Sequence, residues 1–172
     1  MKRLIELITI VLAFLLQCTL FQSLSFAGIV PNLLVVLTSA YGFMGGEREG
    51  MFAGMISGLL MDLFYAPFVG LNALIFLYIG YVNGMANRLF YPEDIKFPIF
   101  CISLSDASCL ILQYMLGFLL RARLDLPYYV LHVMIPELSY TILAAIVLAR
   151  PLLKLFGFAQ RLSRGDEASE DF

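Results

Sequence analysis

The stretch GEREGMFAGMISGLLMDLF, residues 46–64, repeats a small residue at every fourth position. Gly50, Gly54 and Gly58 are followed at the same interval by Asp62, and apolar side chains fill most of the positions between them. Residues four apart lie on one face of a helix, so this segment predicts a helix with a flat, glycine-lined face that ends in a carboxylate. In lipid, such stripes let two helix backbones approach closely. An acid in such a helix is expected to face protein or a cavity and not lipid.

A second stripe of small residues follows in the next apolar segment, residues 70–87, at Gly80 and Gly84. The link between the two segments, residues 67–70, is so short that the segments are expected to form an antiparallel helix hairpin. Two interpretations of the glycine faces remain open. They either seal this hairpin or form a groove that receives a helix of another protein.

Charged residues precede the first stripe at Glu47, Arg48 and Glu49, between Gly46 and Gly50. Charges so close together are not expected deep in a bilayer, so they predict a loop at the membrane surface. We expect this loop to be a cytoplasmic anchor, in which the planar Arg48 guanidinium binds carboxylates or carbonyls of a partner or of the loop itself. The alternative is that Arg48 only helps to keep the loop inside through its charge.

The composition indicates a membrane protein. Of the 172 residues, 61% are hydrophobic and 14% are charged, and the mean hydropathy is +0.89. Soluble domains carry about 25% charged residues. Since one span takes about 20 residues, the chain has room for about six helices and short loops but not for a separate soluble domain. We therefore predict an all-α integral membrane protein in which residues 1–172 form one polytopic domain.

Apolar runs, and the Gly and Pro residues between them, divide the chain into predicted spans. These are residues 4–26, 29–43, 51–66, 70–87, 97–120 and 128–149. The span at 29–43 is short, because its rise is only about 22 Å across a hydrocarbon core of about 30 Å. Either neighbouring helices shield it, or the helix continues into the charged segment.

The distribution of Lys and Arg predicts the orientation. With the N-terminus inside, only Arg121 and Arg123 of the 11 basic residues fall outside. The others are Lys2, Arg3, Arg48, Arg88, Lys96, Arg150, Lys154, Arg161 and Arg164. Short loops with this bias stay in the cytoplasm, so we expect a multi-pass protein with both termini cytoplasmic.

The C-terminal region is expected to lie at the membrane surface. Residues 150–164 place Leu152, Leu155 and Phe156 on one helix face and basic residues elsewhere, which is typical of an interfacial amphipathic segment. Residues 165–172 are polar and acidic and are expected to be disordered.

The sequence contains no motif for catalysis or phosphate binding. Cys18, Cys101 and Cys109 lie within predicted spans without metal-ligand spacing, and His132 is the single histidine. We interpret the cysteines as packing residues and His132 as an interfacial side chain. The basic residues are dispersed along loop edges, which argues against nucleic-acid binding. We therefore predict a protein that binds other chains and the lipid bilayer, with no enzymatic activity, no metal and no cofactor.

Three acids lie inside predicted spans: Asp62, Asp106 and Glu137. Asp106 belongs to a serine-rich segment, residues 103–108, whose hydroxyl groups are potential donors to it. One interpretation of these acids is a substrate cavity or a proton path. The other is hydrogen bonding between helices that fixes their packing. The sequence leaves both open.

An ordered set of short motifs resembles a known family. The motifs are Pro31-Asn32-Leu33-Leu34, Tyr41-Gly42-Phe43, Gly46-Glu47-Arg48-Glu49-Gly50, Gly58-Leu59-Leu60-Met61-Asp62-Leu63-Phe64 and Gly70-Leu71-Asn72-Ala73-Leu74. In order and spacing they resemble the bacterial rod shape-determining protein MreD. The family positions that we single out are Pro31, Asn32, Gly70 and Asn72. Beyond Arg88 the resemblance is one of hydropathy only, so it assigns no role to Asp106 or Glu137.

The resemblance implies a non-catalytic scaffold of the cell-elongation machinery in the bacterial inner membrane. MreD-like proteins work with the single-span protein MreC, and through it with the MreB filament and the peptidoglycan synthases. The family is also similar to the six-helix fold of the substrate-binding subunits of energy-coupling-factor vitamin transporters. A subunit that binds a small, vitamin-like molecule is therefore the alternative. Such a subunit needs a polar, aromatic-lined pocket that opens to the outside.

Overall fold

The computed structural model describes residues 2–21, 30–66, 69–89, 96–121 and 129–148, and in these ranges it contains helices and no strand. The elements are α1 (Lys2–Leu16) with the π turn η1 (Gln17–Phe21), α2 (Leu33–Gly45), α3 (Glu47–Tyr65), α4 (Leu71–Met85) with the 3₁₀ turn η2 (Ala86–Leu89), α5 (Lys96–Arg121) and a last helix, residues 129–148, which begins with the π turn η3 (Val130–Met134). The predicted all-α class is confirmed, and the six helices lie at the six predicted positions. The interfacial segment 150–164 and the tail 165–172 lie outside the described residues.

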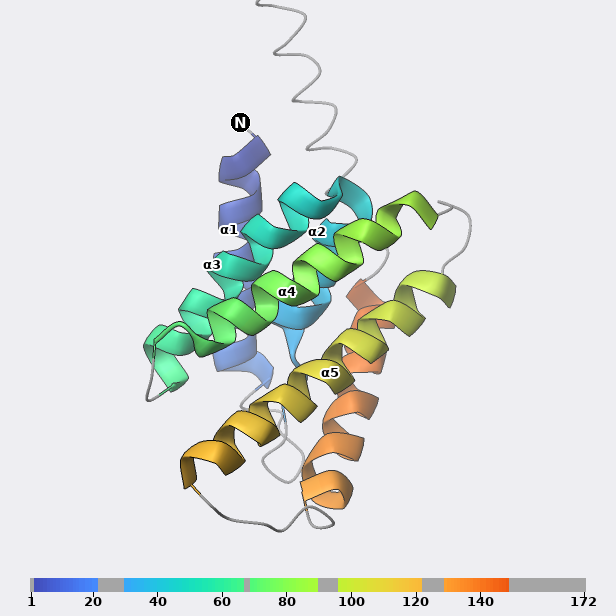
Figure 1. Cartoon of the computed structure of the whole chain (residues 1–172). Helices are drawn as coiled ribbons and strands as arrows, with labels where there is room; N and C mark the ends of the chain where they lie inside the picture. Colours follow the sequence, from blue (N-terminus) through green and yellow to red (C-terminus); the bar gives the residue numbers. More distant parts are fainter. Residues whose placement is uncertain (1, 22–29, 67–68, 90–95, 122–128, 149–172) are drawn as a thin grey trace, which may run out of the picture.

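Helix α2 lies at the centre of the bundle (Figure 1). All of its residues from Leu33 to Phe43 are buried. A helix that is apolar on every side is stable only when other helices surround it, and α1, α3, α4 and α5 all contact α2. The short predicted span is therefore shielded by its neighbours. It does not continue into the charged segment, because Gly46 ends α2 with a positive φ of 86° and α3 begins at the next residue.

Helices α3 and α4 form an antiparallel hairpin whose backbones touch. A Cβ atom added to Gly50 would overlap the carbonyl oxygen of Gly80, and one added to Gly54 would overlap that of Phe76. A Cβ at Gly58 would overlap the backbone of Ala73 in the same way. The two stripes of small residues thus face each other inside the chain. This contact leaves no room between α3 and α4 for a further helix.

A glycine of α2 joins the same contact. A Cβ atom on Gly42 would lie 2.9 Å from the carbonyl oxygen of Gly80 and 3.0 Å from the backbone nitrogen of Gly84. Gly84 itself packs on the backbone of Glu47 at the start of α3. Three helices therefore meet at backbone distance at this end of the bundle, where Asn87 also donates a hydrogen bond to the Phe43 carbonyl.

Helix α1 packs on the outer side of α3. At one end the Arg3 guanidinium lies 4.5 Å above the Phe52 ring and pairs with acids of both helices. At the other end the Phe14 ring lies 5.1 Å from that of Phe64. Between these contacts Ile10 is buried against the core. The opposite face of α1 is apolar and exposed.

Many large apolar side chains point away from the core. They include Leu4, Ile8, Leu12 and Leu15 of α1, Leu63 and Phe64 of α3, Leu74 and Tyr78 of α4, Phe100, Leu104 and Met115 of α5, and Leu131, Leu143 and Val147 of the last helix. An apolar surface of this extent is typical of contact with lipid or with other proteins. Two described helices, Phe97–Met115 and Val130–Leu148, are long and apolar enough to cross a membrane, while the apolar helices Leu33–Gly45 and Leu71–Ala86 are shorter. These features are compatible with a membrane protein.

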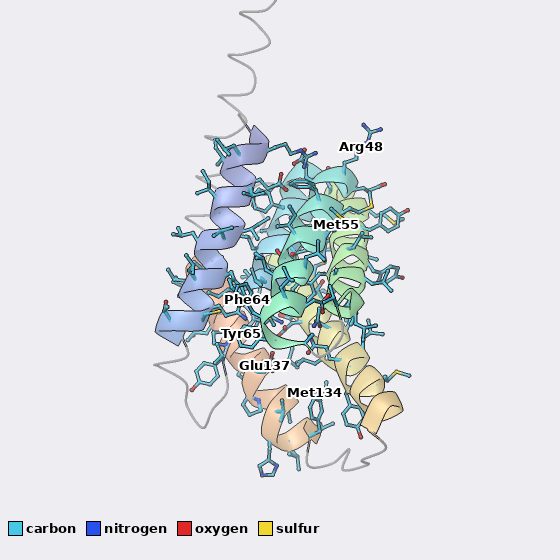
Figure 2. The ribbon with its side chains drawn as sticks, turned by 90° about the vertical axis from the view of Figure 1, so that its left-hand side faces the viewer. Arg48, Met55, Phe64, Tyr65, Met134 and Glu137 are labelled. Carbon is cyan, nitrogen blue, oxygen red and sulfur yellow. The ribbon has the colours of Figure 1, made fainter. Side chains whose placement is uncertain are left out.

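The glycine contact predicts the effect of a single methyl group. We expect Gly54→Ala to lower the free energy of unfolding by about 1–3 kcal/mol, because its Cβ would force α3 away from the Phe76 carbonyl. The neighbouring Met55 is 39% exposed and points away from that contact, so Met55→Ala is a matched control with an expected change of about 0.5 kcal/mol or less (Figure 2). Unfolding of the detergent-solubilised protein measures both. Equal unfolding midpoints for the two variants would contradict the backbone contact.

Candidate functional site

The Asp62 carboxylate lies at the point where α3 ends and α4 begins. Its two oxygens accept hydrogen bonds from the backbone N–H of Gly70 at 2.8 Å, Asn72 at 3.1 Å and Ala73 at 3.0 Å. The side-chain amide of Asn72 donates a fourth bond at 3.0 Å. Asp62 is 1% exposed, so these donors replace the water that the carboxylate loses on burial.

The sequence around Asp62 explains this arrangement. The first N–H groups of a helix have no partner in their own helix, and the helix dipole favours a negative charge at that end. Gly70 adopts a left-handed conformation, with φ at 111°, which turns the chain into α4 just in front of the carboxylate. Asp62 therefore supplies the cap of α4 from the last turn of α3. The two family positions Gly70 and Asn72 are both donors to it.

The polar contact continues from Asn72 into α5. The side-chain amide of Gln113 donates to the Asn72 carbonyl oxygen at 3.1 Å. Asn83 makes a similar link deeper in the bundle, where its amide donates to the Ser105 hydroxyl of α5 at 2.7 Å and to the Ser39 hydroxyl of α2 at 3.3 Å. Sequence reasoning did not single out Gln113 or Asn83. The available signal was an amide side chain within an otherwise apolar span.

The family position Asn32 caps α2 inside the protein. Its side-chain oxygen accepts a hydrogen bond from the N–H of Val35 at 3.3 Å, and its own N–H donates to the Thr141 hydroxyl at 3.2 Å. Gln17 of η1 accepts from the N–H of Leu34 at 3.3 Å. These side chains satisfy donors at the start of a buried helix, where water is excluded. Pro31, just before Asn32, is buried as well.

The acid Asp106 lies in α5 and is fully buried. The expectation that nearby serines bind it is wrong. Ser103 and Ser108 donate to carbonyls of their own helix, and the Ser105 hydroxyl accepts from Asn83. The side chain that interacts with Asp106 is Thr141 of the last helix, although neither Asp106 oxygen has a hydrogen bond of normal geometry within the described part of the chain.

Glu137 lies one helical turn before Thr141 and is half-buried. Thr141, the side chain that interacts with Asp106, lies on the same face of the last helix, and the carboxyl groups of Glu137 and Asp106 interact electrostatically. The two acids that sequence reasoning left without an assigned role are therefore brought together between α5 and the last helix. Asp62 lies apart from them, in its own set of hydrogen bonds at the hairpin turn.

The charged segment Glu47–Glu49 is helical. The predicted loop is reduced to Gly46, and the three charged residues form the first turn of α3, which is a correction to the sequence analysis. Glu49 pairs with Arg3 of α1 at 3.2 Å, and Arg3 also bonds the buried Glu6 at 3.1 Å. Acids in the first turn of a helix are favoured by its dipole.

Arg48 is exposed and points away from the bundle at its end (Figure 2). Among the described residues no ion pair of Arg48 is found, whereas Arg3 pairs with Glu6 and Glu49. Its guanidinium is thus available to bind an acceptor outside the described part of the chain.

The described residues contain no group of three His, Cys, Asp or Glu side chains that is close enough to hold a metal ion. The three cysteines are free thiols. Cys109 is fully buried between the core helices, which fits a packing residue. Cys18 of η1 is partly buried against the core, and its sulfur accepts a hydrogen bond from the Tyr65 hydroxyl of α3 at 3.1 Å.

A comparison with protein families gives one match that covers most of the chain. The family model described as rod shape-determining protein MreD matches residues 1–159. The match includes the glycine stripes, Asp62 and the first turn of α3. Searches of curated proteins and of solved structures gave no significant match.

The hydrogen bonds of Asp62 predict that its charge stabilises the fold. In Asp62→Asn the new amide group would face N–H donors, and we expect a loss of more than about 2 kcal/mol in the free energy of unfolding. Glu47→Gln removes an acid from the first turn of another helix and is the matched control, with an expected loss of less than about 1 kcal/mol. Thermal unfolding in detergent compares the two. An Asp62→Asn variant as stable as the unmodified protein would show that the cap contributes little.

Proposed function

Because the chain belongs to the MreD family of rod shape-determining proteins, we propose that it is a non-catalytic membrane scaffold of the bacterial cell-elongation machinery. Family membership supports a role in cell shape. The observation that carries the scaffold proposal is the exposed apolar surface that surrounds a core sealed by backbone contacts. Such a core keeps its shape while its outer helices contact other chains.

Membership of the family supports protein partners from the rod-shape machinery. We assign direct binding to the single-span protein MreC, and assign MreB and the peptidoglycan synthases to the same complex through it. The glycine stripes of α3 and α4 contribute to partner binding indirectly, since they hold the hairpin together and so position its outer face. The first turn of α3, with Glu47, Arg48 and Glu49, is the proposed anchor at the cytoplasmic surface.

In this proposal the chain is a multi-pass protein of the inner membrane with both termini in the cytoplasm. The exposed apolar side chains and the two long apolar helices support a membrane location. The excess of Lys and Arg on one side supports the orientation. α2 is too short to cross the bilayer by itself, and it is accommodated because other helices cover it.

Reporter fusions test this orientation. We expect fusions at Glu47, at Tyr91 and after Phe172 to report the cytoplasm, and fusions near Phe68 and Leu124 to report the outside. The physical reason is the positive-inside rule for short loops. A fusion after Phe172 that reports the outside would contradict the proposed six-span arrangement.

Arg48 gives the sharpest test of the anchor. We expect affinity purification of the full chain in mild detergent to recover single-span and synthase proteins, and Arg48→Ala to lower that recovery at least fivefold. Arg48→Lys keeps the positive charge, and with it the topology, but loses the planar fork that binds two acceptors at once. We expect it to recover as little partner as Arg48→Ala, and cells that carry it to lose their rod shape.

The controls separate the anchor from simple charge. An exposed ion pair contributes about 1 kcal/mol or less, so neither variant should change the unfolding midpoint of the purified protein appreciably. If Arg48→Lys behaves as the unmodified chain while Arg48→Ala fails, charge alone matters and the anchor is refuted. The same preparation tests the alternative function, since a small molecule that co-purifies in place of protein partners would favour a vitamin-binding subunit.

A further inference from the structure

The acidic pair of Asp106 and Glu137 has no role in the scaffold as described so far. Asp106 is 0% exposed, and both of its carboxylate oxygens are buried without a hydrogen bond of normal geometry to any described residue. Asp62 provides the contrast, because the same chemical group receives four donors there. A buried carboxylate without donors is costly, so an additional group is expected to compensate it.

The described side chains that interact with this pair of acids are Thr141, Tyr129 and Cys109, and none of them carries a positive charge. Thr141 interacts with Asp106, and its hydroxyl oxygen already accepts the N–H of Asn32. Tyr129 and Cys109 interact with Glu137. The Tyr114 ring lies 4.8 Å from the Tyr129 ring, and the buried hydroxyl of Tyr114 also lacks a hydrogen-bond partner in the described part.

Among the residues whose side chains the structure describes, no Lys or Arg interacts with either acid. The described arginines with side-chain contacts are at the other end of the bundle, where Arg3 pairs with Glu6 and Glu49. The two carboxyl groups therefore interact with each other, with no positive charge beside them among the described side chains. In the interior of a membrane protein such an arrangement calls for a cation or a set of donors.

We propose that Asp106 and Glu137 bind a Lys or Arg side chain carried by the membrane-spanning helix of a partner protein. The proposal rests on the membrane scaffold function proposed above and adds the chemistry of the partner. An ammonium or guanidinium group donates to the accessible Glu137 carboxylate, and its positive charge also compensates the buried Asp106 behind it. A metal ion fits less well, because the described residues offer no set of three ligands.

The surface of the last helix shows how a partner reaches the pair. The face of the last helix that carries Glu137 changes in burial along its length. Thr141 and Ala144, toward the C-terminal end, are buried. Val130, Met134 and Glu137, toward the N-terminal end, are half-exposed. Figure 2 shows Met134 and Glu137 on the part of this helix that extends past the end of α3. Glu137 is therefore the accessible carboxylate, and Asp106 lies behind it.

A pair of model peptides tests the proposal without any cellular partner. The full chain is reconstituted in phosphatidylcholine vesicles with synthetic Leu/Ala membrane-spanning peptides that differ at one central position, Lys or Leu. Association is measured by fluorescence energy transfer. We expect the Lys peptide to associate at least tenfold more strongly than the Leu peptide, and this ratio to fall to about one in Glu137→Gln and in Asp106→Asn.

Control variants distinguish a lost binding site from a loss of folding. Ser139→Ala changes an exposed residue of the same helix and should keep the tenfold ratio. Because each variant is judged by the ratio of two peptides, a general loss of association does not imitate the expected result. Glu137→Lys should reverse the preference in favour of a peptide with a central Glu.

Two results would overturn the proposal. The first is equal association of the Lys and Leu peptides with the unmodified chain, or a Lys preference that persists in Glu137→Gln. The second is a Lys preference that appears only when Arg121 or Arg123 is replaced by Ala, because the chain then neutralises the pair itself. The scaffold proposal is judged separately, by the recovery of cellular partners, so either proposal can fail alone.

Discussion

Direct contact between the backbones of α3 and α4 is the constraint on which the rest of the structure depends. Glycines at every fourth position remove the side chains that would separate the two helices, and Gly42 brings α2 to the same place. Association of helices in lipid depends on close packing, since lipid is as apolar as the side chains it replaces. This contact therefore produces a closely packed three-helix core, which α1 and α5 contact (Figure 1).

A second requirement is that helix ends inside the bundle find partners for their N–H groups. α2 begins among other helices, and Asn32, Gln17 and Thr141 satisfy groups at its start. α4 begins at the Asp62 carboxylate. For α2 the partners are Asn32, the residue just before the helix, and the more distant Gln17 and Thr141. For α4 the partner is Asp62 of the preceding helix. The bonds of Gln17 and Thr141 link the core to η1 and to the last helix, and the bonds of Asn72 and Asn83 link it to α5. The polar and the apolar contacts therefore support the same arrangement.

The proposed scaffold function would use the surfaces that this core leaves exposed. The glycine faces are occupied within the chain, so contact with other proteins falls to the outer surfaces. Arg48 extends from one end of the bundle, whereas Glu137 lies in the other half, beyond the end of α3 (Figure 2). A scaffold with separate contact points at the two ends of a rigid core can orient a partner helix as well as bind it.

The sequence by itself determined the all-α class, the positions of the six helices and the α3–α4 hairpin, because apolar length, helix breakers and a period of four are local properties of the chain. The family was also recognisable from the sequence, through ordered motifs that include Pro31, Asn32, Gly70 and Asn72. Only the tertiary structure decided which surfaces meet. In the tertiary structure the two glycine stripes pack against each other, and Asp62 accepts hydrogen bonds from the N–H groups at the start of α4. Asp106 interacts with Glu137 of the last helix and not with the serines of its own helix. These outcomes depend on how helices rotate and approach one another, and sequence spacing within one helix contains no information about the face of its neighbour.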